Sequence, residues 1–162
     1  MNNFKILFKK DAELEKVVKG VDDIWSTYGS ISIVVDKIEI PYLESLGIFI
    51  SYFFSTCLSL LPSLYIGQSG KFELEGPFEL IFEPYNSKIE IYLQDNGKLI
   101  GEKFQVNLKE FARETIKVTQ EFIDYVTQLR PDLNKHKNTK ELQDKVKVAT
   151  AWYFQKFNEK FE

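Results

Sequence analysis

Apolar and charged residues alternate almost without error between Lys71 and Gly97. Successive side chains of a pleated strand point to opposite faces, so this alternation predicts antiparallel sheet. The apolar positions are Phe72, Leu74, Phe78, Leu80 and Phe82, and the acidic positions are Glu73, Glu75, Glu79 and Glu83. The segment therefore predicts a sheet with one face in the core and one acidic face in solvent.

Turn signals divide this sheet into strands. Asn96-Gly97 favours a type I′ turn between a strand that carries Ile89, Ile91 and Leu93 and a strand over 99–106. Pairing of Glu83 with Lys88 keeps both faces consistent and places Glu90 and Tyr92 on the acidic face. At Gly76-Pro77 the chain either bends within one long strand or forms a hairpin whose loop is one residue longer than a two-residue turn.

Two further positions of the sheet need an explanation. Pro77 donates no ladder hydrogen bond, which predicts that its strand lies at or near a sheet edge. Glu102 falls on the apolar face between Ile100 and Phe104. Either a bulge at Gly101 or a position beyond the edge of the core would leave this carboxylate exposed, and the sequence favours these explanations over a buried functional acid.

The remaining elements follow from periodicity and capping residues. The sequence predicts a strand over Phe4–Phe8, a helix from Asp11 to Gly29, and a strand from Ile31 to Ile40 that bends near Asp36-Lys37. Two more helices are predicted, one from Asn107 to Arg130-Pro131 and one that starts at Asn138. The last helix carries an apolar stripe that includes Trp152, Tyr153, Phe157 and Phe161.

No charged residue occurs between Glu44 and Lys71. A gap of this length raises the question of a membrane span. Several serines, Pro62 and the lack of a flanking cation on the near side argue against a span. We therefore expect a buried core helix over Leu46–Leu61 that Pro62 ends or kinks. Together these elements predict a single α+β domain over residues 1–162, an antiparallel β-meander with helices packed mainly on one face.

Signatures of catalysis and of cofactor binding are missing from the sequence. Cys57 is the one cysteine and lies in an apolar run, which favours a buried, inert thiol. The one histidine, His136, stands between two lysines in a predicted connection, so no metal site is expected. We expect no enzyme activity and no cofactor. The net charge of −3 gives no basic footprint for nucleic acid, and the short apolar run at the N-terminus predicts no secretory signal and a cytoplasmic protein.

The acidic sheet face is the candidate binding site. Like charges on neighbouring strands are mildly destabilising, and apolar or aromatic anchors among charges are typical of protein interfaces. A purely solvated face that discourages aggregation remains the other interpretation. The candidate partner-binding residues are Glu73, Glu75, Glu79, Ile81, Glu83, Glu90 and Tyr92.

Three segments, FFSTCLSLLPSLY, GKFELEGPFELIFEP and NLKEFARETIKVTQEFIDYVTQLRPDL, resemble small bacterial immunity proteins of contact-dependent inhibition and related polymorphic toxin systems. The resemblance covers roughly Phe53 to Leu133 and is one of pattern. It implies a cytoplasmic, non-enzymatic protein that binds and neutralises a cognate toxin. If that toxin were a nuclease, Glu-rich strands could occupy its basic cleft as a phosphate mimic.

Two other classes of function stay open. One is a small-molecule carrier or enzyme, in which the aromatic helix Leu46–Leu61 and the sheet enclose an apolar pocket. The other is a homo-oligomeric assembly protein that associates through a strand edge or through the stripe of Trp152, Tyr153 and Phe157. The sequence fixes neither the oligomeric state nor the strand order.

Overall fold

The computed structural model describes residues 3–160. Its strands are β1 (Phe4–Phe8), β2 (Tyr28–Gly29), β3 (Ile31–Val35), β4 (Ile38–Glu39), β5 (Ile48–Phe49), β6 (Gly70–Glu73), β7 (Phe78–Tyr85), β8 (Lys88–Asp95) and β9 (Lys98–Asn107). Its α-helices are α1 (Ala12–Gly20), α2 (Ile50–Tyr65), α3 (Leu108–Leu129) and α4 (Lys137–Phe157), with short 3-10 helices η1 (Ile24–Ser26), η2 (Leu43–Ser45) and η3 (Pro131–Lys135). The chain is an α+β protein with antiparallel sheets, which confirms the predicted class.

The strands form three sheets. The largest is a meander in the order β6-β7-β8-β9, and the N-terminal strands form a separate sheet in the order β1-β3-β4, beside the short pair β2-β5. The predicted single strand from Ile31 to Ile40 is wrong. Asp36 and Lys37 both have positive φ, so the chain reverses there and β4 pairs back onto β3.

The meander forms by tight turns. The backbone N–H of Leu74 donates to the carbonyl of Phe78 at 2.9 Å, so β6 and β7 are joined by a hairpin with the longer loop, and β6 is an edge strand. The predicted pairing of Glu83 with Lys88 is wrong by two residues. Asn86, with φ of 58°, closes a two-residue turn with Ser87, so Tyr85 pairs with Lys88 and Glu83 pairs with Glu90. A shift of two leaves every side chain on its predicted face.

The hairpin between β8 and β9 confirms two predictions. Asp95 pairs with Lys98 around Asn96-Gly97, and both turn residues have positive φ. The register then shifts, because Leu93 pairs with Ile100 whereas Ile91 pairs with Phe104. Gly101 lies in this bulge at φ +74, where the ring of Pro41 would stand 2.9 Å from an added Cβ. Glu102 is exposed, as the bulge predicts.

The helices lie close to their predicted positions, with three corrections. The core helix expected over Leu46–Leu61 is instead α2 over Ile50–Tyr65, so Pro62 does not end it. The first helix ends at Gly20 instead of Gly29, because Asp23 caps the separate turn η1 by accepting from the N–H of Trp25. The last helix begins at Lys137, since Nδ1 of His136 accepts from the N–H of Asn138 and makes His136 the N-cap. Asn107 caps α3 as predicted. Pro62 lies inside the last turns of α2, and the predicted position Phe161 is outside the described residues.

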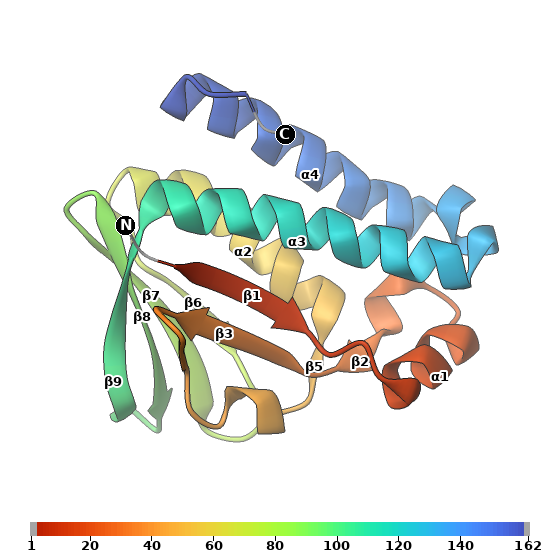
Figure 1. The fold of residues 1–162 in the computed structure, drawn as a ribbon, viewed down its shortest axis with the longest axis horizontal. Helices are drawn as coiled ribbons and strands as arrows, with labels where there is room; N and C mark the ends of the chain where they lie inside the picture. Colours follow the sequence, from red (N-terminus) through yellow and green to blue (C-terminus); the bar gives the residue numbers. More distant parts are fainter. Residues whose placement is uncertain (1–2, 161–162) are drawn as a thin grey trace.

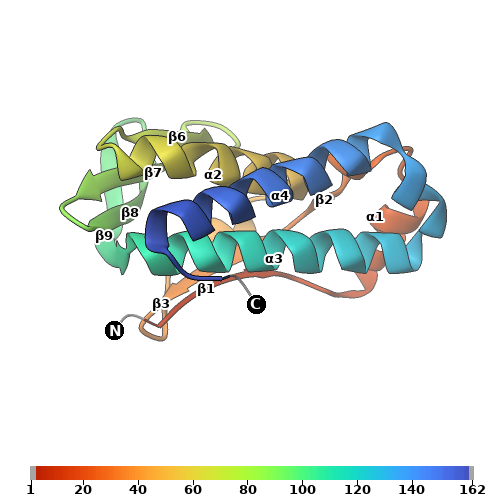
Figure 2. The ribbon, with the colours of Figure 1, turned by 90° about the horizontal axis from the view of Figure 1, so that it is seen from above.

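Aromatic packing connects the layers of the fold. Helices α2 and α3 lie over the sheets, and α4 lies across α2 and α3 (Figures 1 and 2). The Phe53 ring of α2 contacts Phe72 of β6 at 5.1 Å between centroids, and the Phe54 ring contacts Phe122 of α3 at 5.6 Å. Cys57 is fully buried beside them, and burial raises the pKa of its thiol. Among residues 3–160 no helix combines the length and apolar character needed to cross a bilayer.

A half-buried carboxylate accepts a hydrogen bond from the open edge of β1. Strand β1 is at the edge of its sheet, and the N–H of Ile6 on the unpaired side donates to Oε2 of Glu114 in α3 at 3.0 Å. Burial raises the pKa of Glu114 above its ordinary value, although the Ile6 hydrogen bond opposes this. The carboxylate thus satisfies an edge N–H but is less favourable as an anion than in water.

We expect Glu114→Gln to keep a hydrogen-bond acceptor for the Ile6 N–H while removing the half-buried negative charge. Because the pKa of Glu114 is raised in the folded state, its contribution to stability is full below the unfolded pKa and is lost as pH rises through the folded pKa. The free energy of unfolding of Glu114→Gln should therefore equal or exceed that of the wild type at pH 7. In acid the two values should become similar. Glu114→Ala should lower the free energy of unfolding by about 1–3 kcal/mol, since the Ile6 N–H loses its acceptor. Urea unfolding measured at a series of pH values tests this, with Glu44→Gln at an exposed position as the control. A Glu114→Gln variant that is less stable than the wild type at pH 7 would contradict the prediction.

Candidate protein-binding surfaces

The outer face of the β6-β9 sheet gathers most of the predicted binding residues. Cross-strand pairs place Glu73 opposite Glu79, Ile81 opposite Tyr92, and Glu83 opposite Glu90. Directly paired residues share a face, so these six side chains form one patch. We name Glu73, Glu79, Ile81, Glu83, Glu90 and Tyr92 the acidic face. The seventh predicted residue, Glu75, lies in the β6–β7 loop, where its carboxylate accepts from the hydroxyl of Tyr28 at 2.6 Å.

Lysine and glutamine side chains partly neutralise the acidic face. Nζ of Lys71 lies 2.8 Å from Glu79 and 3.7 Å from Glu73, and the amide of Gln94 donates to Glu79 at 3.1 Å. The Lys71 and Gln94 hydrogen bonds lower the pKa of Glu79. The face is therefore less acidic than the sequence pattern suggests, and Glu79 is held in a fixed orientation.

Tyr92 lies on the acidic face but is only 8% exposed. Its hydroxyl donates to Glu83, and the ammonium of Lys103 lies 4.5 Å from the centre of its ring. Burial, followed by the contact with Glu83, raises the pKa of Tyr92 to about 12. The expectation of Tyr92 as an exposed aromatic anchor is therefore wrong, because neighbouring side chains cover the ring. Its hydroxyl instead fixes the Glu83 carboxylate.

The pairing of Glu83 with Glu90 leaves an excess of negative charge at the centre of the face. Directly opposed carboxylates on neighbouring strands repel each other, and Tyr92 supplies a hydrogen bond to one of them only. Ile81, beside this pair, is partly exposed. The arrangement can accept hydrogen bonds from lysine or arginine side chains of another molecule. Among the described residues no cluster of His, Cys, Asp and Glu side chains forms a potential metal site.

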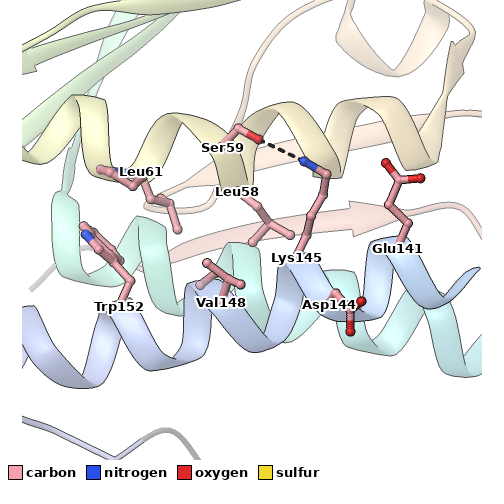
Figure 3. Close-up of a pocket in the computed structure, with 10 residues that line it drawn as sticks. Leu58, Ser59, Leu61, Glu141, Asp144, Lys145, Val148 and Trp152 are labelled. Atoms are coloured by element: carbon pink, nitrogen blue, oxygen red, sulfur yellow. Dashed lines mark hydrogen bonds between the residues drawn. The ribbon is translucent and has the colours of Figure 1, made fainter. Parts of the chain in front are cut away.

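A second concave surface lies between α2 and α4. It is a hollow of about 520 Å³ with Leu58, Leu61 and Pro62 on one side and Val148 and Trp152 on the other (Figure 3). The alternative of a small-molecule carrier or enzyme would need an apolar pocket between the aromatic helix Leu46–Leu61 and the sheet. The Phe53 ring instead packs directly on the sheet, and this hollow opens on the opposite side of α2.

The C-terminal aromatic stripe is divided between the core and the surface. Tyr153 is fully buried, so it contributes to the core and not to an exposed dimer contact. Trp152 and Phe157 are partly buried and pack against Tyr65 of α2 at 5.9 and 6.1 Å between ring centroids. The stripe mainly attaches α4 to α2.

Comparison with known proteins adds no assignment. No model of a protein family matches the chain, and neither a curated protein nor a solved structure matches it. The interpretation of both surfaces therefore depends on their chemistry.

Sequence reasoning missed the residues that hold the carboxylates in place. The predicted pairing of Glu83 with Lys88 would place Tyr92 opposite Glu79, whereas the residue that pairs with Glu79 is Gln94. The turn at Asn86-Ser87 was the available signal, since Asn tolerates the positive φ of a two-residue turn. The α2–α4 hollow had no comparable signal, because it depends on how two distant helices pack.

We expect Tyr92 to contribute to stability only below strongly alkaline pH. A pKa raised in the folded state contributes stability that is full below the unfolded value and lost as pH rises to the folded value of about 12. Tyr92→Phe should therefore show a smaller loss of stability over that alkaline range than the wild type. Thermal unfolding at a series of alkaline pH values measures the difference. An identical alkaline loss in the variant would show that Tyr92 ionises freely.

Proposed function

We propose that the protein is a non-enzymatic binding module that uses the acidic face to bind and neutralise a basic protein partner. The observation that supports this most is the opposed pair Glu83–Glu90 at the centre of the face. Such a pair lowers stability on its own, and cationic side chains of a partner would relieve the repulsion. The partly exposed Ile81 beside the pair adds apolar contact.

The orientation of the carboxylates supports the same proposal. Gln94 and Lys71 hold Glu79, and Tyr92 holds Glu83, so two acceptors are fixed before a partner arrives. Pre-organised groups lose less entropy on binding than flexible surface side chains. This favours a specific docking face over a merely solvated one.

We further propose that the partner is a cognate toxin and that the chain acts as its immunity protein in the bacterial cytoplasm. The resemblance of Phe53 to Leu133 to immunity proteins motivates this step. A nuclease would suit the face, because the cleft that holds nucleic acid phosphates is basic. The carboxylates of Glu79, Glu83 and Glu90 would then occupy phosphate positions.

The first test is co-expression with the products of neighbouring genes. A neighbouring product that stops growth alone, and is tolerated together with this chain, is the expected result. The complex should also be recovered by pull-down. If no neighbouring product is toxic, or if toxicity persists beside this chain without complex formation, the immunity proposal is wrong.

Charge reversal tests whether the acidic face forms the contact. Glu79→Lys, Glu83→Lys and Glu90→Lys together should weaken partner binding by at least about tenfold, since each places a cation against a basic surface. Calorimetric titration measures the affinity, and circular dichroism verifies the fold. The matched control reverses three exposed carboxylates elsewhere, Glu13, Glu39 and Glu44. Unchanged affinity, or an equal loss in the control, would remove this face from the mechanism.

A further inference from the structure

Helix α2 presents an uncharged surface to solvent. None of its residues is charged, yet Tyr52, Ser59, Pro62 and Tyr65 are exposed along one side, and Ile66 follows them at the end of the helix. An exposed helix face of a soluble protein normally carries charged residues. Exposed Tyr side chains beside apolar area are instead typical of binding surfaces.

This surface forms one wall of a long groove. Helices α2 and α4 run side by side (Figure 2), and Val148 of α4, 70% exposed, faces the hollow above Leu58 and Leu61. The hollow shares Glu141 and Lys145 with a second hollow of about 690 Å³, which Trp25, Phe49 and Tyr52 line. The two hollows together extend from Trp152 to Trp25. Tyr52 and Pro62 are about 15 Å apart along α2, which is roughly three turns of a helix.

Aromatic side chains stand at both ends of this groove. The Trp25 and Tyr52 rings are 5.0 Å apart at one end, and the Tyr65 and Trp152 rings are 5.9 Å apart at the other. Small side chains, Ser55 and Ser59, line the groove between them. Small residues between aromatic anchors allow close approach of an elongated apolar ridge.

The charges along the groove are mainly acidic. Asp23, Glu141 and Asp144 line it, and Lys145 is the one cation among the residues that line the two hollows. Nζ of Lys145 lies 3.4 Å from the Ser59 hydroxyl, so the side chain spans from α4 to α2 where the two hollows meet (Figure 3). A helix that lies along both hollows must therefore displace this side chain from Ser59. A ligand with cations beside an apolar ridge complements this pattern, whereas an anionic ligand would meet three carboxylates.

We propose that the α2–α4 groove binds an amphipathic helix of a partner protein, with Leu-like residues in the groove and Lys or Arg at its acidic margin. An open groove several turns long, with aromatic ends, matches the recognition of a helix by i, i+3, i+4 and i+7 anchors. The groove lies on elements other than the acidic face, so this inference does not depend on the proposed function.

A designed peptide tests the proposal on the full chain. The probe has about 14 residues, roughly four helical turns, with leucines at helical spacing and lysines elsewhere. A second peptide has glutamates in place of the lysines. Both tryptophans of the chain, Trp25 and Trp152, line the groove, so their fluorescence reports binding at either end. Anisotropy of the labelled peptide gives the affinity, and circular dichroism follows its helicity.

Two substitutions that add the same charge distinguish binding in the groove from general electrostatic attraction between peptide and protein. Val148→Lys adds a cation and bulk in the groove, whereas Leu7→Lys adds the same charge at a side chain of β1 that is 50% exposed. We expect Val148→Lys to weaken binding of the lysine peptide by at least about tenfold and Leu7→Lys by less than about twofold. The lysine peptide should become helical on binding and change tryptophan emission, and the glutamate peptide should bind at least about tenfold more weakly.

Several outcomes would overturn the proposal. They are equal binding by Val148→Lys and wild type, equal binding of the two peptides, and binding without a gain of helix. Dimers in light scattering that Val148→Lys abolishes would assign the groove to a second copy of the chain. Displacement of the peptide by a small apolar dye, together with a ligand retained in native mass spectrometry, would assign it to a small molecule.

Discussion

The burial of one face of α2 is the constraint on which the other layers depend. Its Phe53 ring contacts β6 in the large sheet, while Phe54 contacts Phe122 of α3 and Phe8 of β1. One uncharged helix thereby joins the two larger sheets to α3, and α4 packs over α2 and α3 (Figure 1). Since the core requires the apolar side of each meander strand, the alternating acidic side chains are left on the outer face.

The two candidate surfaces differ in how they satisfy their polar groups. On the acidic face, Lys71, Gln94, Tyr92 and Lys103 surround the carboxylates and leave an unbalanced pair at the centre. In the groove between α2 and α4 the surface is apolar, and the charges stand at its margin. The first surface suits recognition by charge, whereas the second suits burial of an apolar ridge.

Local signals were sufficient for much of the fold. Alternation predicted the faces of β6 to β8, Asn96-Gly97 predicted the hairpin, and Asn107 predicted the start of α3. These features depend on residues close in the chain, where φ preferences and capping decide the conformation. The pairing of β7 with β8 was wrong by two residues, because either register keeps the faces consistent and only the turn at Asn86-Ser87 distinguishes them.

The sequence by itself determined that α2 is a core helix and that one face of the meander carries glutamates, because both follow from residue type and periodicity. Only the tertiary structure decided that Tyr92 is covered, that Glu75 is bonded to Tyr28, and that α2 and α4 enclose a groove. The physical reason is distance along the chain. Lys103 contacts the Tyr92 ring across the bulged β8–β9 pair, and Val148 and Leu58 line the same hollow because α2 and α4 pack together. Neither arrangement has a local signature in the sequence.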